Sequence, residues 1–372
     1  MKRKVLFVAT ITGHINAFHI PYLKMFKENG YEVHVASNGE QDIEYCDKHF
    51  NIPFARSPLN VNNMKAYKEL KTVINENKYD IIHCHTPVGG ALTRVAAKEA
   101  RKHGTRVIYT AHGFHFYKGA PIKNWLVFYP IERYLARLTD TIITINKEDF
   151  ELAKRKLKCK DIQMVHGVGL DTKKFDVSIS KNEIAKLKEQ CGIDKGNIVL
   201  SYVAEINKNK NQMLLINTMK RLCSMDNRYK LILVGDGIEK ENCEKFVKEN
   251  ELEQYIIFLG KRKDIPQILS ITDIYVASSL REGLPVNILE AMYMKLPIIA
   301  INNRGHRALI NNGQNGFLVS NENELLEKIK IISSNEEVKQ KFQNESKVII
   351  EKYLLNNVEK EMKKIYRIGR KN

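Results

Sequence analysis

The chain has 372 residues, 43% of them hydrophobic and 28% charged, with a formal net charge of +17. This length allows two domains with a full core each, and the composition is that of a soluble globular protein, which excludes disordered and fibrous classes. The apolar runs are no longer than a strand, so no transmembrane helix is expected. Residues 1–170 carry a net +10 and the remainder +7, which favours anionic partners.

The first half alternates strand patterns with helical patterns. The expected strands are 5–10, 32–37, 80–84, 106–110, 141–145 and 162–165, and the expected helices are 18–29, 64–76, 92–103, 123–138 and 147–157. Alternating units of this length predict a parallel sheet that is covered by helices on both faces.

The pattern breaks at residues 166–171, a polar helical stretch follows to about residue 191, and the alternation then restarts. The expected strands are 198–204, 231–234, 256–259, 273–277 and 298–300, the last closing the sheet, and the expected helices are 213–223, 240–250, 265–271, 325–333 and 336–352. We therefore predict an α/β protein with two doubly wound Rossmann-like domains, 1–170 and 171–354, facing a central cleft. A basic tail helix, about 355–372, completes the chain.

The six cysteines are widely spaced, and no Cys-x-x-Cys pair occurs. The sequence therefore indicates neither a cysteine zinc site nor a disulfide framework. A reducing cytoplasm is the expected compartment.

The stretch Arg281–Glu290 organises the second half. It follows a buried strand, turns through Gly283, and enters a helix with Pro285 in the first turn. Glycine lets a ligand approach the backbone, and a helix N-terminus suits a diphosphate. Glu282 and Glu290 suit sugar hydroxyls, which donate to ionised carboxylates. The alternative is an ordinary strand–helix unit with two solvated glutamates.

The string E-G-L-P-V-N-I-L-E-A-M, followed by L-P-I-I-A, resembles the glutamate pair of the family 4 retaining glycosyltransferases, which have the GT-B fold. The resemblance implies that Glu282 contacts the transferred sugar and that Glu290 contacts the nucleotide ribose. It also implies a leaving diphosphate held by Lys210 and by the backbone of a short segment. That segment comprises Gly283, Leu284, Pro285 and Val286.

The same resemblance assigns roles in the first half. Gly13, in the loop after the first strand, is the candidate for approach of the donor diphosphate, and His14 to His19 would face the acceptor. His112, in T-A-H-G-F-H-F-Y-K-G, matches a family histidine near the anomeric carbon. His115 is a candidate acceptor residue, with a packed loop histidine as the favoured alternative.

His83 and His85 lie in I-I-H-C-H-T-P, at the end of a strand. We expect them to point to opposite faces, so that they do not share a metal site.

In the second half, Glu205 stands where the family commonly has an arginine, and Lys210 keeps the family lysine. Lys208 or a neighbour is the expected substitute for the missing cation. Arg262 and Lys263 are candidates for the loop that holds the base. No Asp-x-Asp motif occurs, so we expect no metal and no other cofactor at the diphosphate.

The strings A-F-H-I-P-Y-L and H-C-H-T-P-V-G-G resemble the EpsD/CapM-type branch, which builds exopolysaccharide or capsule units on a lipid carrier. The implied function is retaining transfer from a nucleotide sugar, UDP-hexose or UDP-N-acetylhexosamine, to a saccharide on undecaprenyl diphosphate. The rivals are a nucleotide-sugar 2-epimerase and a basic nucleic-acid-binding protein, for which no recognition motif is present. The aromatic and basic stretch 114–138 is the expected contact with an anionic membrane surface at the inner face of the plasma membrane.

Overall fold

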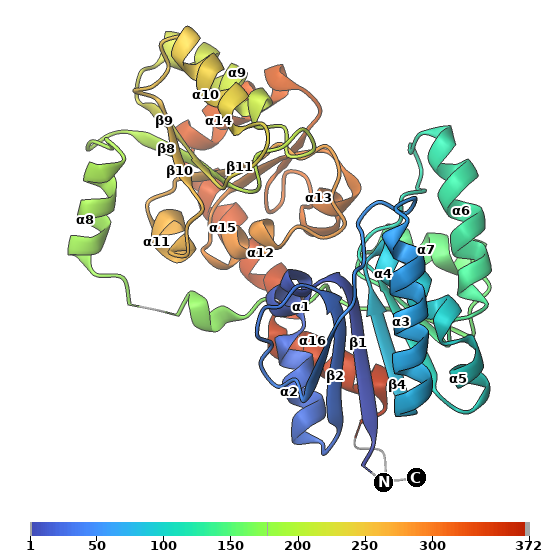
Figure 1. The fold of residues 1–372 in the computed structure, drawn as a ribbon. Helices are drawn as coiled ribbons and strands as arrows, with labels where there is room; N and C mark the ends of the chain where they lie inside the picture. Colours follow the sequence, from blue (N-terminus) through green and yellow to red (C-terminus); the bar gives the residue numbers. More distant parts are fainter. Residues whose placement is uncertain (1, 177, 369–372) are drawn as a thin grey trace. The chain divides into compact units, whose positions relative to one another are not determined.

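The computed structural model describes residues 2–176 and 178–368. The chain divides into two compact units (Figure 1). The first unit is Met1–Gly169 with Asn356–Asn372, and the second unit is Leu170–Leu355.

The first unit is a parallel sheet with helices packed against it, in strand order β3-β2-β1-β4-β5-β6-β7. Its strands are β1 (Lys4–Ile11), β2 (Glu32–Asn38), β3 (Lys48–Asn51), β4 (Ile81–His85), β5 (Arg106–Ala111), β6 (Thr141–Thr144) and β7 (Asp161–Met164). Its helices are α1 (Thr12–Phe18), α2 (Ile20–Glu28), α3 (Asn62–Asn77), α4 (Pro87–Ala96), α5 (Lys98–Lys102), α6 (Ile122–Ala136), α7 (Lys147–Lys156) and α16 (Leu355–Tyr366). The strand order reverses between β1 and β4, which is where such sheets bind ligands.

The second unit is also a parallel sheet, in the order β10-β9-β8-β11-β12-β13. Its strands are β8 (Ile198–Val203), β9 (Tyr229–Val234), β10 (Ile256–Gly260), β11 (Ile274–Ala277), β12 (Ile298–Ile301) and β13 (Phe317–Val319). Its helices are η1 (Thr172–Lys174), α8 (Lys181–Gln190), α9 (Gln212–Met225), α10 (Lys240–Glu249), α11 (Ile265–Ser270), α12 (Val286–Tyr293), α13 (Arg304–Leu309), α14 (Glu322–Ser334), α15 (Glu336–Ile350) and η2 (Glu351–Tyr353). The order reverses between β8 and β11.

Helix α16 packs on the first unit, although it lies at the far end of the chain. The Tyr366 hydroxyl hydrogen-bonds His83 Nδ1 at 2.7 Å, and Glu361 Oε1 lies 2.7 Å from His166 Nδ1. The expected helix ran to residue 372, and its last residues, 369–372, lie outside the described residues. Because the tail is basic, the first unit holds 32 Lys and Arg against 18 Asp and Glu, and the second holds 28 against 25. The charge surplus is thus concentrated in the first unit.

Several elements of the structure were not expected from the sequence. Strand β3 and the short β13 were not expected, because the first is a polar edge strand and the second has three residues. β13 pairs with β12, so residues 298–300 do not close the sheet. Residues 12–18 form α1, where a loop was expected.

Helix α4 begins at Pro87, five residues before the predicted start at residue 92. Gly89 and Gly90 lie within this helix, although glycine disfavours helix interiors. A Cβ on Gly90 would lie 2.6 Å from the Tyr109 ring. The glycine therefore allows α4 to pack closely on β5.

Candidate functional site

Lys210 and Glu282 form an ion pair at the strand-order reversal of the second unit. Lys210 lies near the end of the loop after β8, and Glu282 lies in the loop after β11. Lys210 Nζ is 2.5 Å from Glu282 Oε1. Their side chains are 23% and 14% exposed, so the pair is largely shielded from water. Backbone contacts fix the two loops together, since Leu280 N donates to Asn209 O at 2.8 Å and Ser278 Oγ donates to Lys210 O at 2.7 Å.

Glu290 is the fifth residue of α12 (Val286–Tyr293), little more than one turn into the helix. Pro285 stands just before the helix as its N-cap, not within the first turn. Burial raises the pKa of Glu290 from 4.5 to about 7, and nearby Lys174 opposes the shift. The carboxyl group therefore changes between its protonated and ionised forms near neutral pH, and a hydrogen-bond donor would favour the ionised form.

The start of α13 packs directly on the Glu282 loop, which the sequence did not reveal. Arg304 Nε donates to Glu282 O at 3.2 Å, and a Cβ on Gly305 would lie 2.5 Å from Glu282 Cβ. Gly305 thus lets α13 buttress Glu282. These contacts place Arg304 and Gly305 against Glu282.

A pocket lies beside the first loop of this unit. It is lined by Glu205, Gly235, Asp236, Gly237, Ile238 and Lys261. Arg262, a predicted base contact, instead pairs with Asp264 at 2.5 and 2.7 Å, and neither it nor Lys263 lines the pocket. Lys208, the expected substitute cation, has an 86% exposed side chain that lies 3.9 Å from Glu239. Lys261 is therefore the basic side chain that lines this pocket.

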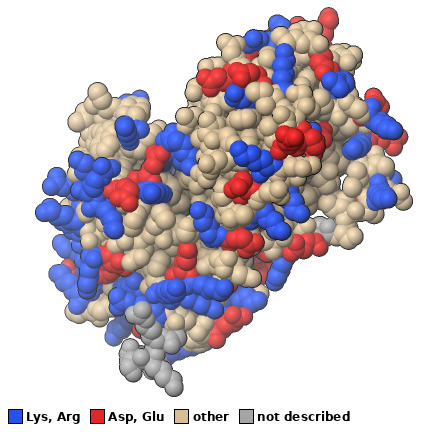
Figure 2. Space-filling view, turned by 180° about the vertical axis from the view of Figure 1, so that it is seen from behind, with Lys and Arg blue, Asp and Glu red and all other residues tan. Residues whose placement is uncertain are grey.

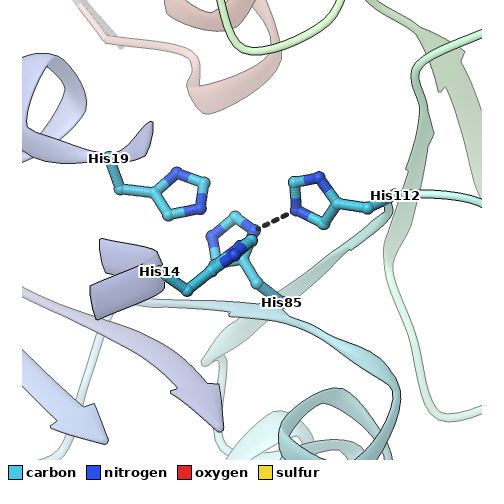
Figure 3. A group of neighbouring side chains, drawn as sticks. All are labelled: His14, His19, His85 and His112. Carbon is cyan, nitrogen blue, oxygen red and sulfur yellow. Dashed lines mark hydrogen bonds between the residues drawn. The ribbon is translucent and has the colours of Figure 1, made fainter. Parts of the chain in front are cut away.

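In the first unit, four histidines converge at the carboxyl ends of β1, β4 and β5. His14 lies in α1, His19 ends that helix, His85 ends β4 and His112 follows β5 (Figure 3). His19 and His85 stack at 3.8 Å between ring centroids, and His14 meets His112 edge-on at 4.9 Å. The group sits at the strand-order reversal of the sheet.

Burial keeps these imidazoles neutral. It lowers the pKa of His14 to about 4 and holds the pKa of His19, His85 and His112 well below the ordinary value of 6.5. Mutual repulsion between protonated rings lowers the last three further. Neutral imidazole can accept a hydrogen bond from a hydroxyl or bind a metal ion.

The expectation that His83 and His85 face opposite sides was wrong. Residues two apart in a strand share a face, and the two rings lie 4.1 Å apart. His83 does stay out of the group of four, because Tyr366 and Thr110 occupy its ring nitrogens at 2.7 and 2.8 Å.

The other predicted residues of the first unit lie nearby in the chain but have different surroundings. His115 stacks on Phe128 of α6 at 4.6 Å, so it packs as a loop histidine. Gly13 lies in α1, where an added Cβ would meet only the Gln41 side chain at 3.8 Å. The fold therefore does not itself require glycine at position 13.

Comparison with known proteins decides the family. The sequence model of glycosyl transferases group 1 matches residues 183–348, and that of glycosyl transferase 4-like proteins matches residues 4–146. EpsD of Bacillus subtilis (strain 168) is 45% identical over 320 residues, which cover 86% of this chain and 84% of that protein. The chain belongs to the group 1 glycosyltransferases. The resemblance to family 4 enzymes is thus confirmed.

A second relative of this glycosyltransferase is the UDP-Gal:alpha-D-GlcNAc-diphosphoundecaprenol alpha-1,3-galactosyltransferase of Escherichia coli, 32% identical over 70% of this chain and 67% of that protein. Among solved structures, Anabaena HepE in complex with UDP and glucose has a TM-score of 0.79 at 19% identity, covering 98% of this chain and 99% of that one. Sucrose-phosphate synthase of Thermosynechococcus elongatus has a TM-score of 0.79 at 16% identity, covering 98% of both chains. The predicted GT-B fold is confirmed.

Proposed function

We propose that this glycosyltransferase transfers a hexose or N-acetylhexosamine from a UDP-sugar, with retention, to a saccharide on undecaprenyl diphosphate during exopolysaccharide or capsule synthesis. The shielded Lys210–Glu282 pair carries the proposal, because it places one cation and one carboxylate at the carboxyl edge of the second sheet. The relatives support the choice of substrates, since one of them is a galactosyltransferase with a diphosphoundecaprenol acceptor.

The second unit is the proposed donor-binding domain. Glu282 orients the transferred sugar by accepting hydrogen bonds from its hydroxyls, and Glu290 does the same for the ribose. Lys210 and the backbone at the start of α12 stabilise the charge that develops on the diphosphate. A diphosphate that reaches Lys210 competes with Glu282 for the ammonium group. When the diphosphate binds Lys210, the Glu282 carboxylate is released and becomes available to the sugar.

The first unit is the proposed acceptor-binding domain, with His14 and His19 toward the acceptor and His112 toward the transferred sugar. In the retaining step, the bond between the sugar C1 and the diphosphate oxygen breaks, and the acceptor oxygen bonds to C1 on the same face. The proton of the acceptor hydroxyl goes to the departing UDP. The protein supplies positioning and electrostatic stabilisation rather than a nucleophile.

The experiment that tests this function is a panel of UDP-sugars, each incubated with native lipid-linked acceptors and read by mass. We expect the acceptor to gain one hexose or N-acetylhexosamine from one donor. Conversion of a donor alone into its 2-epimer would contradict the proposal and would favour the epimerase.

We also propose that the first unit docks on anionic lipid through α6. Five of its apolar side chains are about half or more exposed: Ile122, Leu126, Val127, Ile131 and Tyr134. The acid of this helix, Glu132, is buried against Arg94, while Lys123 and Arg133 are exposed. Lys and Arg are dense over the first unit, at the lower left of Figure 2. An apolar and basic surface of this kind suits an interfacial helix.

Leu126 of the expected stretch 114–138 faces solvent, but most of the aromatic residues in that stretch do not. Phe114 and Phe116 are buried in the core, and Trp125, Phe128 and Tyr129 pack against it, so these aromatics hold α6 to the sheet. Among residues 2–176 and 178–368, no helix has the length and apolarity needed to cross a bilayer.

Replacing Lys118 and Lys123 by Glu is expected to weaken binding to anionic liposomes by more than tenfold, because each lost basic residue removes about 1 kcal/mol of attraction. Flotation with liposomes of stated anionic content measures the effect. The matched control carries the same charge change on exposed Lys186 and Lys188 of α8, in the second unit. Equal flotation of wild type and both variants would rule out α6 as the docking surface.

A further inference from the structure

The four histidines His14, His19, His85 and His112, here called the histidine cluster, leave buried nitrogen atoms without partners. Among the described residues, His14 Nε2, both ring nitrogens of His19 and His85 Nε2 have no hydrogen-bond partner. His19 and His85 are 2% and 1% exposed. A buried polar atom without a partner costs about 1–3 kcal/mol, so these nitrogen atoms point to a bound ligand that supplies the missing contacts.

Other buried histidines of the first unit are satisfied. His34 bonds Tyr79 and Glu32 through its two nitrogens, each at 2.8 Å, and His83 bonds Tyr366 and Thr110. The unsatisfied nitrogens are therefore particular to the cluster and do not reflect a general feature of how this sheet buries histidine.

The dimensions of the cluster fit a single ion. One nitrogen from each histidine can be chosen so that all four atoms lie within 4.8 Å of one another. His112 Nε2 and His85 Nδ1 are 3.4 Å apart, which is long for a hydrogen bond. Two nitrogens on a tetrahedral zinc ion lie about 3.3 Å apart, given Zn–N bonds of about 2.0–2.1 Å. A sugar ring does not fit among atoms this close, since each hydrogen bond to it spans about 2.8 Å.

We propose that the histidine cluster binds one zinc-class divalent ion. Imidazole nitrogen is a preferred ligand of zinc and of neighbouring transition metals, whereas magnesium and calcium prefer oxygen. The buried rings are neutral, which is the form that binds metal. His19 lacks a partner for its outward nitrogen, and such partners are worth about 10–100-fold in metal affinity. The site is therefore weaker by this factor than a fully supported zinc site.

Metal binding has a consequence for sugar transfer, which rests on the proposed function. A lone pair that coordinates an ion cannot accept a hydrogen bond from a sugar hydroxyl. An ion in the cluster therefore withdraws His112 from the transferred sugar and His14 and His19 from the acceptor. Zinc therefore acts as an inhibitor, and the metal-free protein is the active form.

Calorimetry with Zn²⁺ alone, on protein free of affinity-tag histidines, tests the binding. We expect one Zn²⁺ per chain, no binding of Mg²⁺, and a visible absorption band typical of tetrahedral coordination with Co²⁺. His19→Gln and His85→Gln should each weaken Zn²⁺ binding by roughly tenfold or more, because losing a ligand costs at least what losing a supporting partner costs. His103→Gln and His115→Gln are the matched controls outside the cluster, and melting curves show which variants fold.

Absence of saturable Zn²⁺ binding to the wild type would overturn the proposal. The proposal would also fail if His103→Gln abolishes Zn²⁺ binding while His19→Gln leaves it intact. The wild-type result needs no variant to fold. In a separate arm, Zn²⁺ should inhibit sugar transfer and Mg²⁺ should not. If the transfer assay fails altogether, the proposed function fails, while the calorimetric result still decides the metal site.

Discussion

Lys210→Met is expected to lower the rate constant of sugar transfer by about 100–1,000-fold. Removing one preorganised group that stabilises developing charge has an effect of this size. Methionine keeps an unbranched stem of four heavy atoms and removes the ammonium group that lies 2.5 Å from Glu282. The measurement is single-turnover transfer with saturating donor. Lys208→Met is the matched control, because Lys208 lies two residues away with an 86% exposed side chain.

Loss of Lys210 also leaves Glu282 shielded and unpaired, which destabilises the loop by itself. The double variant Lys210→Met/Glu282→Gln separates the two effects. If Lys210 acts on the diphosphate, the double variant stays at least as slow as Lys210→Met. Recovery of activity in the double variant would show that the lysine serves only to neutralise Glu282.

Glu290→Gln is expected to weaken UDP binding at pH 8 by tenfold or more. Each hydrogen bond to an ionised carboxylate contributes about 1.5–3 kcal/mol, and about 1.4 kcal/mol corresponds to tenfold in affinity. Because burial raises the pKa of Glu290 to about 7, UDP affinity of the wild type should fall as the pH drops from 8 to 6. Calorimetry at both pH values measures this. The fall should be smaller in the Gln variant, whose remaining pH dependence comes from protonation of the terminal phosphate of UDP.

Glu290→Gln is expected to weaken UDP binding but to increase the stability of the folded protein at pH 8. The folded pKa of Glu290 lies above its unfolded value, so stability is lost as pH rises from about 4.5 through 7. The cost of the buried charge at pH 8 is about 3 kcal/mol. Glu290→Gln should therefore melt at a higher temperature than the wild type at pH 8, while exposed Glu253→Gln should not. Unchanged UDP affinity in a folded Glu290→Gln protein would contradict the ribose assignment.

The site of the second unit was easier to predict from the sequence than the site of the first unit. The Arg281–Glu290 stretch is continuous in the chain, so its strand, turn and helix were readable from local patterns. The pairing of Lys210 with Glu282 was not readable, since 72 positions separate them and only the parallel sheet brings them together. Gly305 gave no sign of its contact with Glu282, because close approach of two loops leaves no periodic pattern.

The histidine cluster shows why the first unit was harder to predict. His14, His19, His85 and His112 follow three different strands, and no metal-ligand spacing links them in the sequence. The topology was predicted, however, and residues after β1, β4 and β5 meet at one edge of such a sheet. His83 and His85 were the one local clue in the sequence. We predicted that they point to opposite faces of the strand, although residues two apart share a face.

The most direct test of metal-independent, retaining transfer uses the UDP-sugar that the donor panel identifies. Transfer is carried out in excess EDTA, and the anomeric configuration of the product is read by NMR. We expect full activity and a product with the anomeric configuration of the donor, because Lys210 and the start of α12 take the place of a cation at the diphosphate. An inverted product, or activity that EDTA abolishes and Mg²⁺ or Mn²⁺ restores, would contradict it.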